Sequence, residues 1–386
     1  MGILKYEVKK LFLNKVSIAI ILAFTIIPAI SNYFSEIDYV NNVASMKELY
    51  EFEKQYEGKV DENYFVNNQD KLELIKNKAQ FQIENKEEQF YFDYYNTINN
   101  LETYRGVKED KRNSIESLKV LLEEIKKQDG EDSYSYKNVE KKYNTMVSLG
   151  EPEFYFAKGW SDLFSQMSKT ANLFIGLMII LLASTIFSNE YSSGMDSLIF
   201  STKGGRSKSV KTKLLAVIIF GVSVVLFYNL VQFLSVIIPT SIIGWDAPLR
   251  SQIDFAFTPY NLTMLQYFGV SIVCQMIGVV TLGCMVTFIS SLFKSSIASF
   301  FTSFIIYMIP FISMVLGLGR IKLVGEAMKL ATINLIGVYD LFREYYCYNI
   351  LGKPVDYIYV IIIANIIVAI TFALLTNKCI SKRNAS

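Results

Sequence analysis

The chain has 386 residues, of which 52% are hydrophobic and 19% are charged, and its formal net charge is +2. Soluble proteins carry about 25% charged residues, so this composition favours a membrane protein. Histidine is absent, which excludes histidine-based catalytic triads, histidine-ligated zinc or haem, and imidazole proton relays.

The charged residues are distributed very unevenly. Residues 35–169 hold 46 of the 74 charged residues, with 19 basic and 27 acidic side chains. A membrane-spanning helix needs about 20 mostly apolar residues. Six stretches meet this requirement and contain no Asp, Glu, Lys or Arg: 16–34, 171–188, 214–243, 265–293, 296–318 and 357–376. The sequence therefore predicts an all-α membrane protein with six transmembrane helices.

The first fifteen residues predict a short amphipathic helix. Its apolar residues fall on one side of a helical wheel, namely Leu4, Val8, Leu11 and Phe12, while Glu7, Lys9 and Lys10 lie elsewhere. Such a helix is suited to the membrane interface beside anionic lipid. We expect residues 1–15 to lie there, either as a simple membrane anchor or in a more specific role.

Residues 35–169 predict a helical domain outside the membrane. Ile115, Leu118, Leu122 and Ile125 follow a helical 3–4–3 spacing, and Gly130 marks a turn. We expect a long antiparallel helical hairpin that stands off the membrane. Its apolar residues either pack the core of this domain or form a surface that captures an amphipathic or cationic substrate. Just before the second span, Trp160 and Phe164 are expected in an aromatic belt at the membrane interface.

The segment 189–213 carries the most specific pattern. Glu190-Tyr191-Ser192-Ser193-Gly194 closes the second span, and a basic run from Lys203 to Lys213 leads into the third. Together with the six-span layout, this pattern resembles the permease subunits of ABC transporters of the type-2 exporter family. In that family an E-Y-x-x-G-like turn starts a coupling helix, and a basic stretch follows. Glu190, Tyr191, Ser193 and Gly194 match the turn, and Arg206, Ser207 and Lys213 match the basic stretch.

The resemblance implies that 189–213 docks in a groove of a cytoplasmic ATPase, with the N-terminal helix packed beside it. It also implies two copies of an ABC ATPase subunit and a second permease copy or paralogue as partners. ATP and Mg would be bound by the ATPase, since this chain has no G-x-x-x-x-G-K-[ST] loop and no cofactor is expected in it. An ordinary basic inner loop that binds anionic headgroups is the alternative interpretation. Membrane lipid is a further expected partner, and nucleic acid is not.

Polar residues inside the expected spans are amides and hydroxyls. Four of them are candidates for lining a translocation path: Asn229, Gln232, Gln275 and Asn365. Hydrogen bonding between helices is the alternative role for these amides. The absence of ionisable residues from the spans argues against a carrier coupled to protons or sodium ions.

Residues 319–356 precede the last span. The stretch 323–342 is apolar but contains Glu326, Lys329 and Asp340, so we expect one or two short re-entrant helices that dip into the outer leaflet rather than a seventh span.

Basic residues in the flanks orient the protein, because cytoplasmic loops are enriched in Lys and Arg. Residues 1–15, the loop 189–213, the turn at Lys294 and the tail 377–386 hold 13 basic and 3 acidic residues. We therefore expect a multi-pass protein of the cytoplasmic membrane with both termini in the cytoplasm. The 319–356 loop is expected outside despite its five basic residues.

These features favour a non-enzymatic permease subunit of an ATP-driven exporter. Its substrate is expected to be amphipathic or lipophilic, with an antimicrobial peptide or a lipid as candidates. A membrane sensor or scaffold, whose outer domain binds an envelope partner, is the alternative hypothesis.

Overall fold

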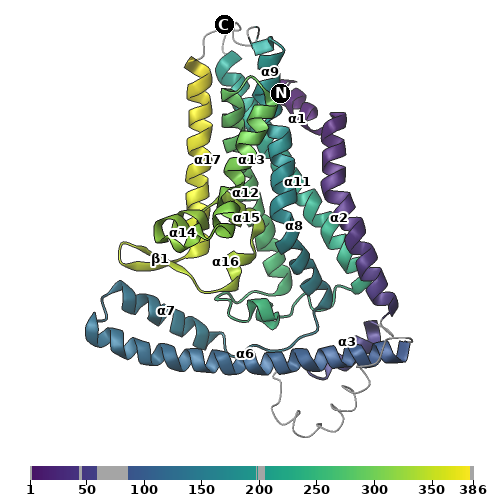
Figure 1. Ribbon diagram of the computed structural model, residues 1–386, viewed down its shortest axis with the longest axis vertical. Coiled ribbons are helices and arrows are strands. Elements are labelled where there is room, and N and C mark those ends of the chain that lie inside the picture. Colours follow the sequence, from purple (N-terminus) through teal and green to yellow (C-terminus); the bar gives the residue numbers. More distant parts are fainter. Residues whose placement is uncertain (1, 43–45, 59–85, 197, 199–204, 383–386) are drawn as a thin grey trace.

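The computed structural model describes residues 2–42, 46–58, 86–196, 198 and 205–382. Six long apolar helices stand side by side as a bundle, both termini lie at one end of it, and a helical hairpin lies across the other end (Figure 1). The predicted number of spans is therefore confirmed. The spanning helices are α2 Lys15–Asn42, α8 Lys158–Ala183 with its continuation α9 Thr185–Ser192, α11 Gly205–Thr240, α12 Met264–Leu292, α13 Ser296–Val315 and α17 Tyr357–Lys382.

Helix α12 lies at the centre of the bundle and contacts α8, α11, α13 and α17. Its first turn is fixed by a capping box, in which Thr263 and Gln266 each accept a backbone hydrogen bond from the other. Gly278 of α12 allows a close approach, because a Cβ atom at this position would lie 2.7 Å from Ile336 Cγ1. The short helix that contains Ile336 thereby packs directly onto α12.

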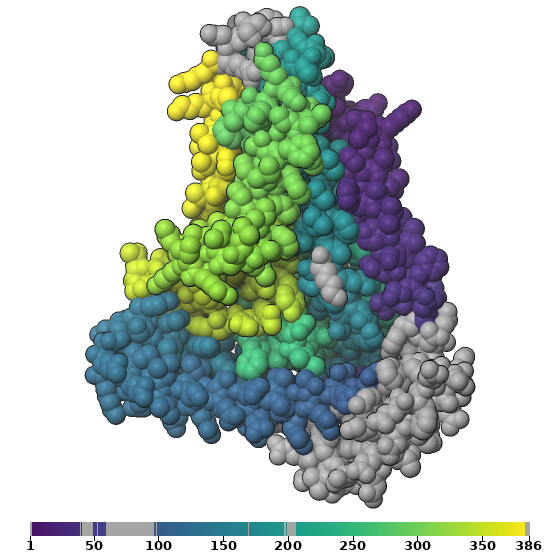
Figure 2. All heavy atoms as spheres, viewed as in Figure 1, coloured from purple at the N-terminus to yellow at the C-terminus, as the bar shows by residue number. Residues whose placement is uncertain are grey.

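The outer hairpin consists of α6 Lys86–Gln128 and α7 Tyr134–Ser148, which are joined by a turn at Gly130 with φ +77°. The residues with the helical 3–4–3 spacing lie in α6, as their spacing predicts, with Leu118 buried and Ile115, Leu122 and Ile125 half-buried. We expected this hairpin to stand off the membrane, away from the helix bundle, and this expectation is wrong. The hairpin lies across the end of the bundle (Figure 2). An ion pair of 2.7 Å between Lys141 Nζ and Asp356 Oδ1 joins it to the β-hairpin before α17. The short helix α3 Met46–Lys54 contacts α6.

Helix α8 begins at Lys158, well before the expected start of the second span. The expectation that Trp160 and Phe164 face the membrane interface is wrong. Trp160 is fully buried and Phe164 is 4% exposed, and the Trp160 ring packs against Phe233 and Phe268. Its Nε1–H donates to the Ile242 carbonyl over 3.2 Å, so both aromatic residues belong to the core between helices.

The segment before the last span is more varied than expected. One or two short helices were expected in 323–342, but the structure has three, α14 Lys322–Lys329, α15 Thr332–Gly337 and α16 Tyr339–Arg343, preceded by the 3₁₀ turn η3 Leu318–Arg320. A two-stranded antiparallel hairpin then follows, β1 Cys347–Ile350 and β2 Lys353–Asp356. Its turn residues Leu351 and Gly352 both have positive φ, at 52° and 77°, which is typical of a tight two-residue hairpin turn. Two further 3₁₀ turns, η1 Leu249–Ser251 and η2 Ile253–Phe255, lie between α11 and α12.

Candidate functional site: a buried charge cluster at the terminal end

The E-Y-x-x-G turn lies at the end of α9, on the same side of the bundle as the two termini (Figure 1). Glu190 and Tyr191 are buried at 8% and 7% exposure. Ser193 Oγ donates to the carbonyls of Asn189 and Glu190 and closes the helix end. Gly194 follows with φ +69°, a left-handed conformation that costs a non-glycine residue about 1–2 kcal/mol. This local geometry explains the glycine in the motif.

The basic stretch of the motif is not a loop where the structure describes it. Residues 205–213 were expected to be part of a loop, but they form the first turns of α11 and continue directly into the spanning helix. Lys213 consequently lies inside the bundle and is fully buried. Because Lys213 belongs to the continuous helix α11, its position relative to the other spanning helices is fixed.

Lys213 holds two carboxylates from different parts of the chain. Its Nζ donates to Glu190 Oε1 over 2.5 Å and to Glu7 Oε1 over 2.7 Å. Lys10 Nζ lies 3.9 Å from the same Glu190 oxygen, and the Lys213 ammonium lies 5.5 Å from the centre of the Phe187 ring. Two ammonium groups and two carboxylates thus form a compact neutral cluster. It joins the N-terminal helix, the end of α9 and the start of α11.

The sequence did not predict that Glu7 and Lys10 belong to this cluster, and Glu7 is the buried one of the two. Glu7 lies away from the apolar residues of the first helix, yet it is only 5% exposed. Its second carboxylate oxygen, Oε2, has no hydrogen-bond partner among the residues that the structure describes. A buried charge is costly unless it is paired, so the contact with Lys213 is what makes this burial tolerable.

The N-terminal helix, α1 Gly2–Phe12, packs against the bundle with the residues predicted for its apolar face. Leu11 is buried at 5% exposure, and Leu4, Val8 and Phe12 pack against the core formed by α8, α11 and α12. The rings of Phe12 and Phe220 meet edge to face with centroids 5.0 Å apart. The apolar face therefore contacts protein in this structure.

Arg206, the other basic residue matched to the motif, lies apart from the cluster. Its Nη1 contacts the Ser381 carbonyl at the end of α17 over 3.4 Å. The structure thus connects the start of α11 with the C-terminal helix through Arg206 and with α1 and α9 through Lys213.

A serine network links α9 to the central helix α12. Ser290 Oγ donates to the Ser184 carbonyl over 2.7 Å and accepts from the backbone N–H groups of Phe187 and Ser188. Ser296, at the start of α13, donates to Asn189 Oδ1 over 2.6 Å. The sequence offered no distinctive signal for Ser290, because a serine near the end of an apolar helix is common. These contacts attach the turn after the second span to α12 and α13.

The four amides proposed for a path are all buried, at 2% exposure or less, and they occupy three separate places. Asn229 Nδ2 donates to Gln275 Oε1 over 2.6 Å, which joins α11 to α12. Gln232 donates to the Thr25 carbonyl and accepts from Asn32, which joins α11 to α2. Asn365 accepts from Thr332 Oγ1 and donates to the Leu330 carbonyl, beside α15. In this conformation the four amides form hydrogen bonds between helices, which was the alternative to lining a translocation path.

Among the described residues, no group of three or more Asp, Glu, Cys or His side chains could hold a metal ion. The comparisons with known proteins identify the family. A family model described as an ABC-2 family transporter protein matches residues 1–345 of the chain. No curated protein matches the sequence, and no solved structure matches the fold.

Proposed function

The chain belongs to the ABC-2 family of transporter membrane proteins, whose permeases are not catalytic, and from this we propose that it is the membrane subunit of an ATP-driven exporter. It moves an amphipathic or lipophilic substrate, such as an antimicrobial peptide or a lipid, across the cytoplasmic membrane. Two copies of an ABC ATPase subunit bind ATP and Mg and supply the energy. A second permease copy or paralogue completes the transporter.

The orientation that we propose puts both termini and the α9–α11 region in the cytoplasm. The support is the concentration of basic residues in 1–15, 189–213 and 377–386. The hairpin α6–α7, at the opposite end of the bundle (Figure 1), then lies outside the cell.

The buried Glu7–Lys213–Glu190 cluster carries the proposal that α9 couples ATP hydrolysis to transport. A rigid connection is needed if movement of an ATPase against α9 is to reach the spanning helices. Lys213 supplies this connection to α11 and α1, since it is fully buried and within 2.7 Å of both carboxylates. The Ser184–Ser290 hydrogen bond supplies a second connection to α12. Together they would transmit a push on α9 to the core of the bundle.

A second permease subunit needs an apolar surface, and α13 offers one. Ile297, Phe301 and Ile305 are 70%, 56% and 56% exposed and recur at helical spacing on one side of α13. We infer that this side contacts the second permease subunit when that subunit is another copy of the chain. Cysteine substitution at Phe301 followed by oxidative cross-linking in membranes tests this: a cross-linked dimer is expected, and its absence at Phe301, Ile305 and Ile297 alike would contradict it.

The proposed coupling is tested by isolating the transporter and measuring ATP hydrolysis. An ABC ATPase should co-purify with the chain in mild detergent, and the wild-type permease should stimulate its activity. We expect Lys213→Gln to reduce this stimulation at least tenfold. Lys211→Gln, which removes the same charge from an exposed position on the same helix, should retain it.

Two outcomes would contradict the proposal at different levels. If Lys213→Gln stimulates the ATPase as well as Lys211→Gln does, the cluster is not the coupling connection. If no ATPase is ever recovered with the wild-type chain, the proposed ATP-driven export fails and the sensor hypothesis gains support.

A further inference from the structure

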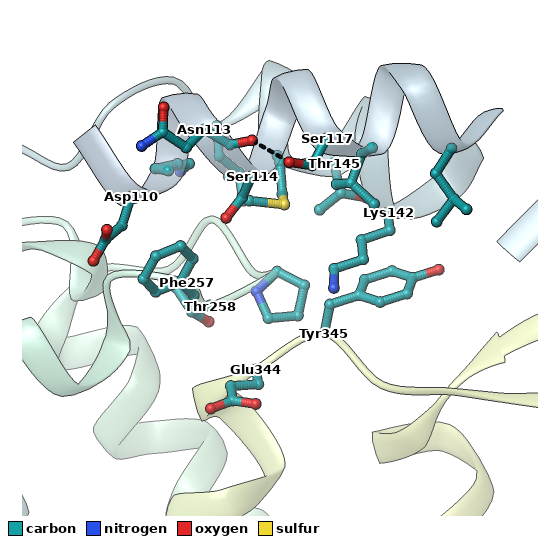
Figure 3. A pocket seen from close by; sticks show the side chains of 16 residues that line it. Asp110, Asn113, Ser114, Ser117, Lys142, Thr145, Phe257, Thr258, Glu344 and Tyr345 are labelled. Carbon is teal, nitrogen blue, oxygen red and sulfur yellow. Dashed lines mark hydrogen bonds between the residues drawn. The ribbon is translucent and has the colours of Figure 1, made fainter. Parts of the chain in front are cut away.

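A cavity of about 590 Å³ lies between the outer hairpin and the loops at that end of the bundle. Its walls come from the hairpin α6–α7, from residues 257–259 before α12, and from residues 344–345 after α16 (Figure 3). Tyr345 OH donates to the carbonyl and side-chain oxygens of Asn138 over 3.2 Å, which holds α7 against the 344–345 segment. The volume is in the range of about 300–1,000 Å³ that is typical of small-molecule sites.

Two lysines of the hairpin line this cavity. The Lys142 side chain extends from α7 into it, beside Tyr345 (Figure 3). Lys111, from α6, also lines it and is only 2% exposed. Within the described part of the chain, neither ammonium has an ion-pair or hydrogen-bond partner, whereas neighbouring Arg112 is bound to Glu151 over 2.7 Å.

An unpaired buried ammonium is unfavourable, because the protein removes its hydration without replacing it. Burial is also the main reason that the pKa of Lys111 is lowered to about 8, with nearby Arg250 contributing and Glu151 opposing. At neutral pH Lys111 therefore remains largely charged. An anion bound in the cavity would supply negative charge that the chain itself does not provide.

The remaining residues that line the cavity include apolar residues, hydroxyl residues and two carboxylates. Leu118, Met146, Phe257 and Pro259 provide apolar walls, and Ser114 and Thr258 provide hydroxyl groups. Two carboxylates also line the cavity. Glu344 lies 3.9 Å from Arg343 Nε, and Asp110 is exposed and lies at the far end from Lys142 (Figure 3). The end near Lys142 is thus left without a compensating negative charge.

We propose that this cavity binds a small amphipathic organic anion. Lys142 holds its carboxylate or phosphate group, Lys111 adds positive charge elsewhere in the lining, and its apolar part packs against Leu118, Met146 and Phe257. The site is independent of the proposed export function, because the ligand can bind to the outer domain whether or not it is transported.

Binding is tested by calorimetry on the full chain purified in dodecyl maltoside. The probes share a naphthyl group and differ in charge: 1-naphthaleneacetate and 1-naphthyl phosphate are anionic, 1-naphthylethylamine is cationic and 1-naphthaleneethanol is neutral. We expect one or both anions to bind at least tenfold more tightly than the amine and the alcohol. The preference between the two anions identifies the favoured acid group.

Variants distinguish the effect of the two lining lysines from the effect of the overall charge of the hairpin. Lys142→Gln should weaken anion binding at least tenfold, and Lys111→Met, which removes positive charge from another part of the lining, should weaken it by a smaller factor that exceeds twofold. Lys119→Gln removes a charge from an exposed position of α6 that does not line the cavity, and it should bind within twofold of wild type. Lys142 is half-buried, so Lys142→Gln keeps the test valid even if Lys111→Met alters folding.

Three results would overturn the proposal: the absence of binding by both anions, equally tight binding by the amine or the alcohol, or lysine variants that bind like Lys119→Gln. The last two would indicate nonspecific association of the naphthyl group with apolar surface or detergent.

Discussion

Lys213 and Glu7 are 206 positions apart in the sequence, yet the Lys213 ammonium donates to Glu7 Oε1 over 2.7 Å in a buried site. The same ammonium binds Glu190, so one lysine joins the first helix, the end of α9 and the start of α11. Breaking a buried ion pair by removing one partner typically costs about 3–5 kcal/mol, because the other charge is left uncompensated.

We therefore expect Lys213→Met to lower the free energy of unfolding by about 3–5 kcal/mol, since it leaves both Glu7 and Glu190 without their shared cation. Lys211→Met, on the exposed side of the same helix, should change it by less than about 0.5 kcal/mol. Denaturant unfolding of the purified protein, followed by circular dichroism, measures both. Equal stability of the two variants would show that the cluster does not stabilise the fold.

Gly194 provides a test of the turn itself. Its φ of +69° is left-handed, and no atom lies within 4 Å of a Cβ built there. Gly194→Ala should therefore cost only backbone strain, about 1–2 kcal/mol, and should weaken stimulation of the partner ATPase by shifting the end of α9. Gly194→Asn should restore most of the activity, because asparagine tolerates the left-handed conformation. If alanine and asparagine behave alike in the ATPase assay, backbone conformation at this turn does not matter.

The spans could be predicted because a membrane imposes length and apolarity on each helix separately. Glu7 could not be predicted as a buried residue, because amphipathicity assigns the charged side of a helix to solvent. In the folded chain that side meets Lys213, which the helical continuation of α11 brings into the bundle. A pairing between residues so distant in sequence leaves no local pattern.

The segment 347–356 shows a different limit. Its turn residues Leu351 and Gly352 have positive φ, but leucine is an unusual choice for such a position. The sequence therefore lacked the Asn-Gly or Asp-Gly signal that normally indicates a tight hairpin. The expectation that Trp160 lies in an interfacial aromatic belt is wrong for another reason. Aromatic residues near the end of a span also pack between helices, as the contacts of Trp160 with Phe233 and Phe268 show.

The packing of α15 on α12 depends on Gly278. A Cβ atom at this position would lie 2.7 Å from Ile336 Cγ1 and 3.2 Å from Leu335 Cβ, so Gly278→Ala must displace α15. We expect a loss of about 1–3 kcal/mol in the free energy of unfolding, as for other overpacked cores. Gly269→Ala is the matched control on the same helix, because nothing lies within 4 Å of its added methyl group. It should be neutral or slightly stabilising. Equal unfolding midpoints for the two variants would contradict the close approach.

The last prediction concerns pH and the buried amine of Lys111. Burial lowers the pKa of this group from 10.5 to about 8 in the folded protein, so between these two values the unfolded chain binds more protons than the folded chain. Stability then rises with pH through this window: the contribution of Lys111 is most favourable above about pH 10.5 and is lost as the pH falls to about 8. Lys111→Met should therefore be more stable than wild type at pH 7, and its advantage should shrink steadily from pH 8 to pH 10. Comparing the two proteins at each pH cancels the titration of every other group. An advantage for Lys111→Met that is the same at pH 7 and pH 10 would show that the Lys111 ammonium is not desolvated in the folded protein.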